Sequence, residues 1–189
     1  MNDSEKRPLT ENGANVLILG IGNILLSDEG AGIRVVEGFQ GRYLLPPEVE
    51  AVDGGTLGLA LLPYLKGRSH VLLIDAVKGG KAPGTISRME LTDPPAFLST
   101  RISPHQIGLS EILTVATLTD GLPPIMILFG IEPSRLEVGL EMSPEVAANI
   151  DPLIERVAHE LAGMKISLRP RPAGVPTNPS FPAEEKKSG

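Results

Sequence analysis

Short apolar runs alternate with helical patterns along most of the chain. Four of these runs predict strands: Val16 to Gly20, Val49 to Asp53, His70 to Asp75 and Ile125 to Ile131. Helical patterns follow over 28–43, 57–65 and 103–118, and a last one begins at Ser143 and carries an apolar stripe. Strands that alternate with helices are typical of a parallel sheet with helices on both faces.

Two further features refine this prediction. Residues 85–91 alternate only loosely between apolar and polar, which indicates an edge strand in either orientation. Ser-Pro pairs at 103–104 and 143–144 mark helix starts, and Gln106 completes a capping box after the first pair. The predicted fold class is therefore α/β, with a mostly parallel five-stranded sheet and one edge strand that could run antiparallel.

The ends of the chain differ from its middle. Residues 1–14 are polar and predict a loose N-terminal arm. Residues 169–189 are rich in proline and lack periodicity, which predicts a disordered tail. The whole chain has 189 residues, and the part between these ends, 15–168, is long enough for one domain with a substantial core.

Composition narrows the classes of function. The chain has no cysteine, which excludes disulfides, thiolate metal sites and cysteine nucleophiles. A net charge of −6 argues against a nucleic-acid partner. The apolar runs are too short for membrane insertion, and the first ten residues hold no apolar signal segment. A cytoplasmic location is the expectation.

Several polar residues fall where such sheets bind ligands, outside the carboxyl ends of the strands. Glu29 follows the first strand, Asp75 ends the third, and His105 is the second residue of a capped helix. Asp53, at the end of the second strand, is a fourth candidate. A helix N-terminus favours the neutral imidazole that a metal needs. Two carboxylates and one imidazole suit a divalent first-row transition metal.

Each of these residues also has an ordinary structural explanation. Asp75 could cap a turn, and His105 could be a surface residue at a helix start. The turn Gly20-Ile21-Gly22, with Asp53 on the next strand, also fits a dinucleotide-binding fold. Against nucleotide binding, Leu25 stands in place of the third glycine, and the nearby acids would repel a pyrophosphate.

Four motifs occur in one order along the chain: GIGNILLSDEGAG at 20–32, DGGT at 53–56, LLIDAV at 72–77 and SPHQIGL at 103–109. Together they resemble the maturation endopeptidases of nickel-iron hydrogenases, over roughly 15–161 and including GIEP at 130–133. The resemblance implies a three-layer α/β/α fold. It also implies cleavage of a C-terminal extension from the precursor of a [NiFe] hydrogenase large subunit, after nickel insertion.

The same resemblance assigns roles to residues. By motif match, Glu29, Asp75 and His105 would bind metal, and Asp53 matches an aspartate linked to substrate recognition or activity. Glu29 and Asp53 are the catalytic candidates, and Asp53, Gly54 and Thr56 the substrate-binding ones. The expected metal is nickel supplied by the substrate, with another divalent metal in the same site as the alternative. A non-enzymatic nickel-handling or hydrogenase-assembly chaperone is the competing function.

Overall fold

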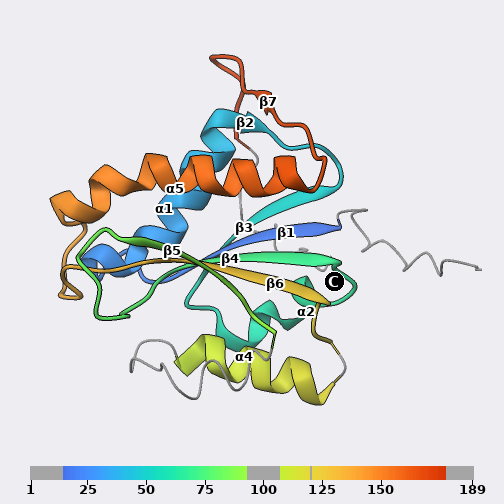
Figure 1. Ribbon diagram of the computed structural model, residues 1–189, viewed down its shortest axis with the longest axis horizontal. Helices are drawn as coiled ribbons and strands as arrows, with labels where there is room; N and C mark the ends of the chain where they lie inside the picture. The colour runs from blue at the N-terminus through green and yellow to red at the C-terminus, as the bar shows by residue number, and fades with distance from the viewer. Residues whose placement is uncertain (1–14, 93–106, 120, 178–189) are drawn as a thin grey trace, which may run out of the picture.

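A five-stranded sheet forms the centre of the protein (Figure 1). The computed structural model describes residues 15–92, 107–119 and 121–177. The strands of the sheet are β1 (Val16–Ile21), β3 (Val49–Gly55), β4 (His70–Ala76), β5 (Ile86–Glu90) and β6 (Ile125–Ile131), in the order β3-β1-β4-β6-β5. All neighbours are parallel except β5, which pairs antiparallel with β6 at the edge. The predicted fold class is confirmed, and the edge strand is antiparallel.

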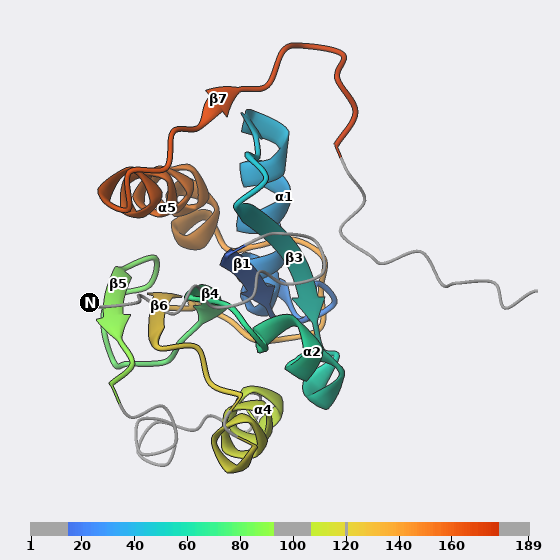
Figure 2. The same cartoon turned by 90° about the vertical axis from the view of Figure 1, so that its right-hand side faces the viewer.

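Helices cover both faces of this sheet, which makes three layers (Figures 1 and 2). On one face lie α1 (Ala31–Arg42) and α5 (Pro144–Gly163). On the other lie η2 (Gly58–Leu61), α2 (Leu62–Leu65) and α4 (Ile107–Leu118). A short 3₁₀ turn, η1 (Ser27–Gly30), precedes α1. No helix in the described part of the chain is long and apolar enough to cross a membrane.

Two hydrophobic cores lie between these layers, because side chains alternate between the faces of a strand. In β4, Leu72 and Ile74 pack with α1 and α5, whereas Val71 and Leu73 pack with α2 and α4. The near-continuous apolar strands thus result from burial on both faces, which is the normal condition of a central parallel strand. The alternation also decides to which face the polar residue at the end of each strand points.

The ends of the fold depart in part from the sequence prediction. A second small sheet pairs β2 (Tyr43–Leu44) with β7 (Arg169–Pro170). Arg171 donates hydrogen bonds to the carbonyl oxygens of Gln40, at 2.6 Å, and Tyr43, at 3.2 Å. The tail was predicted to be disordered from Arg169, but its first residues form a strand, and Arg171 ties them to the end of α1. Residues 1–14, 178–189 and the capping box at 103–106 lie outside the described residues.

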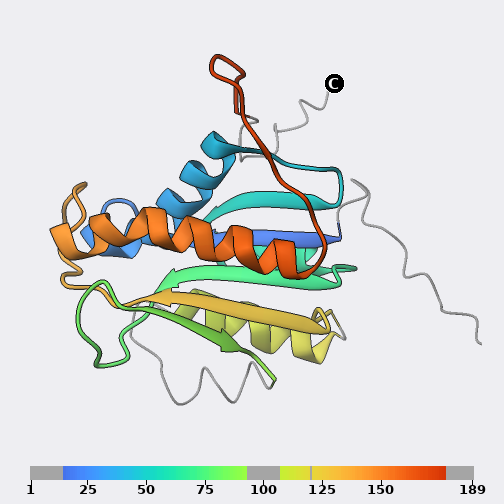
Figure 3. The ribbon, with the colours of Figure 1, turned by 45° about the horizontal axis from the view of Figure 1, so that its top comes forward.

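The strand order creates a topological switch point between β1 and β4. From β1 the chain passes through α1 to β3 on one side, and it then returns to β4 on the other side of β1. The connections after β1 and β4 therefore lead away in opposite directions, and α1 and α4 lie on opposite faces of the sheet (Figure 3). In open α/β sheets, ligands bind at such a switch point, outside the carboxyl ends of the strands.

Candidate functional site

Asp75 lies in β4 at this switch point. Its side chain is 4% exposed and follows Leu73 in the alternation, so it points to the face covered by α2 and α4. Its partner on the neighbouring strand is Gly130. A glycine there leaves no side chain beside the carboxylate on β6, and a Cβ on Gly130 would lie 3.1 Å from Val77. The sheet thus places a buried acid at its rim, beside a position on β6 where only a glycine fits without a close contact.

Glu29 reaches the same place from the other strand. It lies in η1, which follows β1, contacts β4 and leaves Glu29 only 8% exposed. Gly32, three residues on, packs directly against both strand ends. A Cβ on Gly32 would lie 2.3 Å from the carbonyl oxygens of Ile21 and Ile74. Only glycine permits this approach, which brings the turn of Glu29 against the end of β4, where Asp75 follows Ile74.

Asp28, the neighbour of Glu29, has a different role. Its fully buried carboxylate accepts hydrogen bonds from the backbone N–H groups of Ser134, Arg135 and Ser143 and from the Ser143 hydroxyl, at 2.6–2.9 Å. Burial alone would raise the pKa of Asp28, but the hydrogen bonds from Arg135, Ser143 and Ser134 lower it below its ordinary value. Two adjacent acids in the sequence are thus separated in function, and Asp28 joins η1 to the loop between β6 and α5.

Glu132 organises the loop that follows Asp75, and the sequence analysis assigned it no role. Its carboxylate accepts hydrogen bonds from the backbone N–H groups of Gly79, at 2.8 Å, and Gly80, at 3.1 Å. Its backbone pairs with Gly84 and Thr85 at the other end of the loop. Glu132 is the acid of the GIEP motif, and its place one residue after a buried strand was the available signal.

Asp53 lies apart from the two buried acids. It is separated from β4 by β1, and it shares the parity of Val49 and Ala51, so it points to the face of α1 rather than the face of Asp75. The pKa of Asp53 lies above its ordinary value, mainly because burial disfavours the charged carboxylate. A hydrogen bond from the Gly55 N–H lowers this pKa, and the nearby charge of Glu37 raises it further.

The other two residues of this predicted group lie at the same rim. Gly54 is buried, and a Cβ there would lie 2.9 Å from Leu19 Cδ1 and 3.0 Å from the Gly20 carbonyl oxygen. Thr56 is exposed. Gly54 therefore has a packing role of its own, whereas Asp53 and Thr56 present polar groups at the end of β3.

The predicted third ligand, His105, lies outside the described residues, although α4, which begins two residues later, covers the face to which Asp75 points. Among the described residues there is no group of three His, Cys, Asp or Glu side chains placed to hold a metal. The described donors are the two carboxylates of Glu29 and Asp75. Oxygen donors of this kind fit a divalent cation, and an imidazole would direct the set toward a transition metal.

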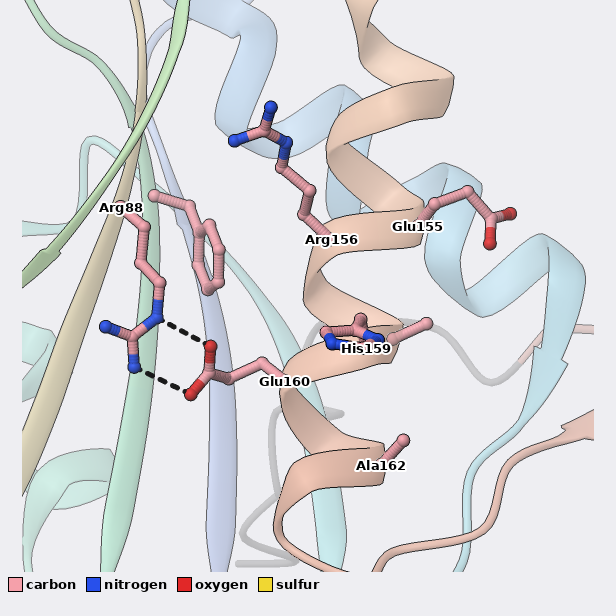
Figure 4. A pocket seen from close by; sticks show the side chains of 8 residues that line it. Arg88, Glu155, Arg156, His159, Glu160 and Ala162 are labelled. Atoms are coloured by element: carbon pink, nitrogen blue, oxygen red, sulfur yellow. Dashed lines mark hydrogen bonds and ion pairs between the residues drawn. The ribbon is translucent and has the colours of Figure 1, made fainter.

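A pocket lies between α5 and β5, on the face of the sheet opposite to that of Asp75. This pocket of about 650 Å³ has Phe129 and Ala162 in its lining, together with Arg88, which binds Glu160 through two hydrogen bonds of 2.7 and 2.8 Å (Figure 4). His159 also lines it. The paired charges of Arg88 and Glu160 already satisfy each other, so the arrangement is that of a structural ion pair.

Comparison with known proteins identifies the family of the chain. The family profile described as "Hydrogenase maturation protease" matches residues 33–160. The chain is 40% identical over 159 residues to the Hydrogenase 2 maturation protease of Escherichia coli, covering 84% of this chain and 97% of the relative. It is 41% identical over 155 residues to the hydrogenase expression/formation protein HupD of Rhodobacter capsulatus, covering 81% and 74%.

Solved structures give the same result. The hydrogenase maturating endopeptidase HybD of E. coli superposes with a TM-score of 0.77 at 39% identity, covering 83% of this chain and 98% of that one. The hydrogenase 2 maturation peptidase of a Thaumarchaeota archaeon superposes with a TM-score of 0.60 at 30% identity, covering 81% and 99%.

Proposed function

Because this chain belongs to the hydrogenase maturation protease family, we propose that it removes the C-terminal extension from a [NiFe] hydrogenase large-subunit precursor after nickel insertion. The observation that carries this proposal is that two buried acids, Glu29 in η1 and Asp75 in β4, lie on elements that contact each other at the switch point. Burying a carboxylate costs free energy unless it is paired, and a bound cation is one partner that would offset this cost.

In this proposal the metal arrives with the substrate. Glu29, Asp75 and His105 would bind the nickel ion that the precursor already holds. Two carboxylates and one imidazole make an incomplete coordination shell, which leaves positions for ligands from the precursor. When bound, such an ion can polarise the scissile carbonyl or serve as a docking point for the cleavage site. Another divalent metal in the same site is the alternative, and the cytoplasmic location stays a prediction.

The surroundings of the two acids suit a polypeptide substrate. Leu25 is 57% exposed, Val138 87% and Leu140 64%, and all three lie near η1. Gly139 holds the loop against this turn, since its N–H donates to the Leu25 carbonyl oxygen at 2.9 Å and its own carbonyl oxygen accepts from Ser27 N–H at 2.8 Å. A fixed group of exposed apolar side chains is typical of a protein-binding surface.

Asp53 is placed to act on the polypeptide rather than on the metal. Its carboxyl is half-buried at the end of β3, and the raised pKa makes it a better proton acceptor than an ordinary aspartate. Gly22 donates a hydrogen bond of 3.1 Å to the Gly55 carbonyl oxygen, which joins the Asp53 rim to the loop before η1. We therefore assign Asp53 and Thr56 to contacts with the chain that is cleaved.

The deciding experiment incubates the purified protein with nickel-loaded and with nickel-free large-subunit precursor. The proposal expects a shortened large subunit only from the nickel-loaded precursor, and no shortening with Glu29→Ala or His105→Ala although both variants stay folded. Formation of a complex without a shortened product would instead support the chaperone. Cleavage of both precursors at the same rate would exclude nickel recognition while keeping the peptidase.

A further inference from the structure

The turn that carries Glu29 is attached to the loop between β6 and α5 by several hydrogen bonds, and the Asp28 side chain accepts four of them. Asp28 binds three backbone N–H groups from this loop, at Ser134, Arg135 and Ser143. The neighbouring Ser27 adds a hydrogen bond of 3.0 Å from its hydroxyl to the Glu137 carbonyl oxygen. The residues thus connected are more than 100 positions apart in the sequence.

The same turn is short and strained. Ser27 has a φ of +51°, a backbone conformation that costs a residue with a side chain about 1 kcal/mol or more. Within η1 the Glu29 N–H reaches the Leu26 carbonyl oxygen at 3.2 Å, and the Ala31 N–H donates to the Asp28 carbonyl oxygen. A four-residue turn with so few internal bonds depends on outside contacts, and Asp28 supplies four of them.

We propose that Asp28 is a positioning residue, which holds the carboxylate of Glu29 at the rim by fixing η1 to the 134–143 loop. Asp28 is fully buried, so it touches neither the precursor nor its metal. It acts through Glu29: when the loop contacts are lost, the turn can rotate and carry the neighbouring carboxylate away from Asp75. The role goes beyond the family assignment, because a buried acid beside a functional acid would otherwise be taken for a second member of the site.

Asp28→Asn is the appropriate change, because asparagine keeps the shape of the side chain. It retains one of the two oxygen acceptors, Oδ1 or Oδ2, and replaces the other with an NH₂ group. That group cannot accept from the N–H donors that face it. Asp151→Asn is the matched control, since Asp151 is exposed on α5 and pairs with Arg42, away from η1. Both variants are first checked for folding by circular dichroism and thermal unfolding.

Hydrogen exchange of backbone amides tests the inference without any cleavage assay. In Asp28→Asn we expect exchange to rise at least tenfold at Glu29 and Ala31 as well as at Ser134, Arg135 and Ser143. Asp151→Asn should leave all five amides unchanged. If exchange rises only at the three loop amides, Asp28 merely caps the loop and the inference is wrong. This arm stands even if the proposed function fails, because it needs no substrate.

The kinetic arm rests on the proposed function and uses Glu29→Asp, which keeps a shortened carboxylate. With nickel-loaded precursor we expect Asp28→Asn to lower kcat at least tenfold while KM changes less than threefold. Because Asp28 acts through Glu29, the double variant should be no more than about threefold slower than Glu29→Asp alone. Multiplying effects in the double variant, or an unchanged kcat in folded Asp28→Asn, would overturn the positioning role. Absence of cleavage by the unaltered protein would contradict the proposed function instead.

Discussion

Asp28 and Ser143 are joined by two hydrogen bonds across 115 positions of sequence: the Ser143 N–H donates at 2.6 Å and its hydroxyl at 2.9 Å. Ser143 is also the N-cap of α5 and accepts a bond from the Val146 N–H at 3.4 Å. One serine therefore caps α5 and ties it to the turn that carries Glu29. The start of α5 and the turn η1 are thus held together by the same residue.

Ser143→Ala should lower the free energy of unfolding by about 1–2 kcal/mol. The change removes an N-cap and a hydrogen bond to an ionised carboxylate, and these contributions are typically about 1 kcal/mol or somewhat more each. Urea denaturation at pH 7 measures the loss. Ser167→Ala is the control, because Ser167 is exposed, and it should change stability by less than about 0.5 kcal/mol. Equal stability of the two variants would contradict the account of Ser143.

Asp75→Asn and Asp53→Asn should differ in their effects on cleavage and on binding of the precursor. Asp75→Asn should abolish cleavage of nickel-loaded precursor, because it removes one of two buried carboxylates that would share the ion. Asp53→Asn should slow cleavage but leave binding of the nickel-loaded precursor intact, since Asp53 points to the opposite face. A pull-down of precursor and a gel assay of its cleavage separate the two. Loss of nickel-dependent binding in Asp53→Asn would place Asp53 in the metal site after all.

The isolated protein should contain little metal. Its candidate ligands form an incomplete shell that is completed by the precursor, so no ion is held tightly between encounters. Elemental analysis of freshly purified protein, without added chelator, gives the measurement. One equivalent of tightly bound zinc would mean that the metal belongs to the protein, and that the nickel of the precursor is not what Glu29 and Asp75 bind.

Val138→Asp and Leu140→Asp should raise KM for the precursor about tenfold or more and leave kcat within about threefold. Each change puts a charge into an apolar surface that the substrate would cover, and truncating or disrupting a central contact typically costs more than 1 kcal/mol. The control is Leu118→Asp, because Leu118 is 81% exposed at the end of α4 that leads to the start of β6, away from the rim. Equal effects of all three variants would contradict a precursor contact at the 138–140 loop.

The ion pair between Arg88 and Glu160 should make stability depend on pH. The hydrogen bonds from Arg88 hold the pKa of Glu160 below its ordinary value, with burial acting in the other direction. The pair therefore stabilises the fold above the ordinary carboxyl range of about pH 4–5 and loses this contribution as the pH falls through the lower pKa of the folded state. Arg88 is 41% exposed, which limits the contribution to about 1 kcal/mol.

Urea denaturation of the unaltered protein and of Glu160→Gln, at pH 7 and at low pH, tests this contribution. The two proteins should differ at pH 7 and converge in acid, whereas Glu48→Gln, a change at an exposed glutamate, should follow the unaltered protein throughout. A difference that stays constant over this pH range would mean that Glu160 contributes through packing rather than charge.

Much of the fold was determined by the sequence itself. Apolar runs such as Val16 to Gly20 and Ile125 to Ile131 predict buried strands, and the Ser-Pro pair at 143–144 starts a helix by local hydrogen bonding. The edge strand was predictable from its weaker pattern, but its antiparallel direction was not. Direction depends on how the connection returns to the sheet, and local propensity carries no such information.

The site divides in the same way. That Glu29, Asp53 and Asp75 end or follow strands is a fact of sequence, and their common position at one rim follows from parallel strands. Only the tertiary structure decided that Asp53 and Asp75 point to opposite faces of the sheet. It also decided that Asp28 binds a distant loop while Glu29 lies at the switch point. The hydrogen bonds that Glu132 accepts from the loop after Asp75 are likewise visible only in the folded chain. The reason is physical: hydrogen bonds between segments 52 to 115 residues apart depend on strand order and packing.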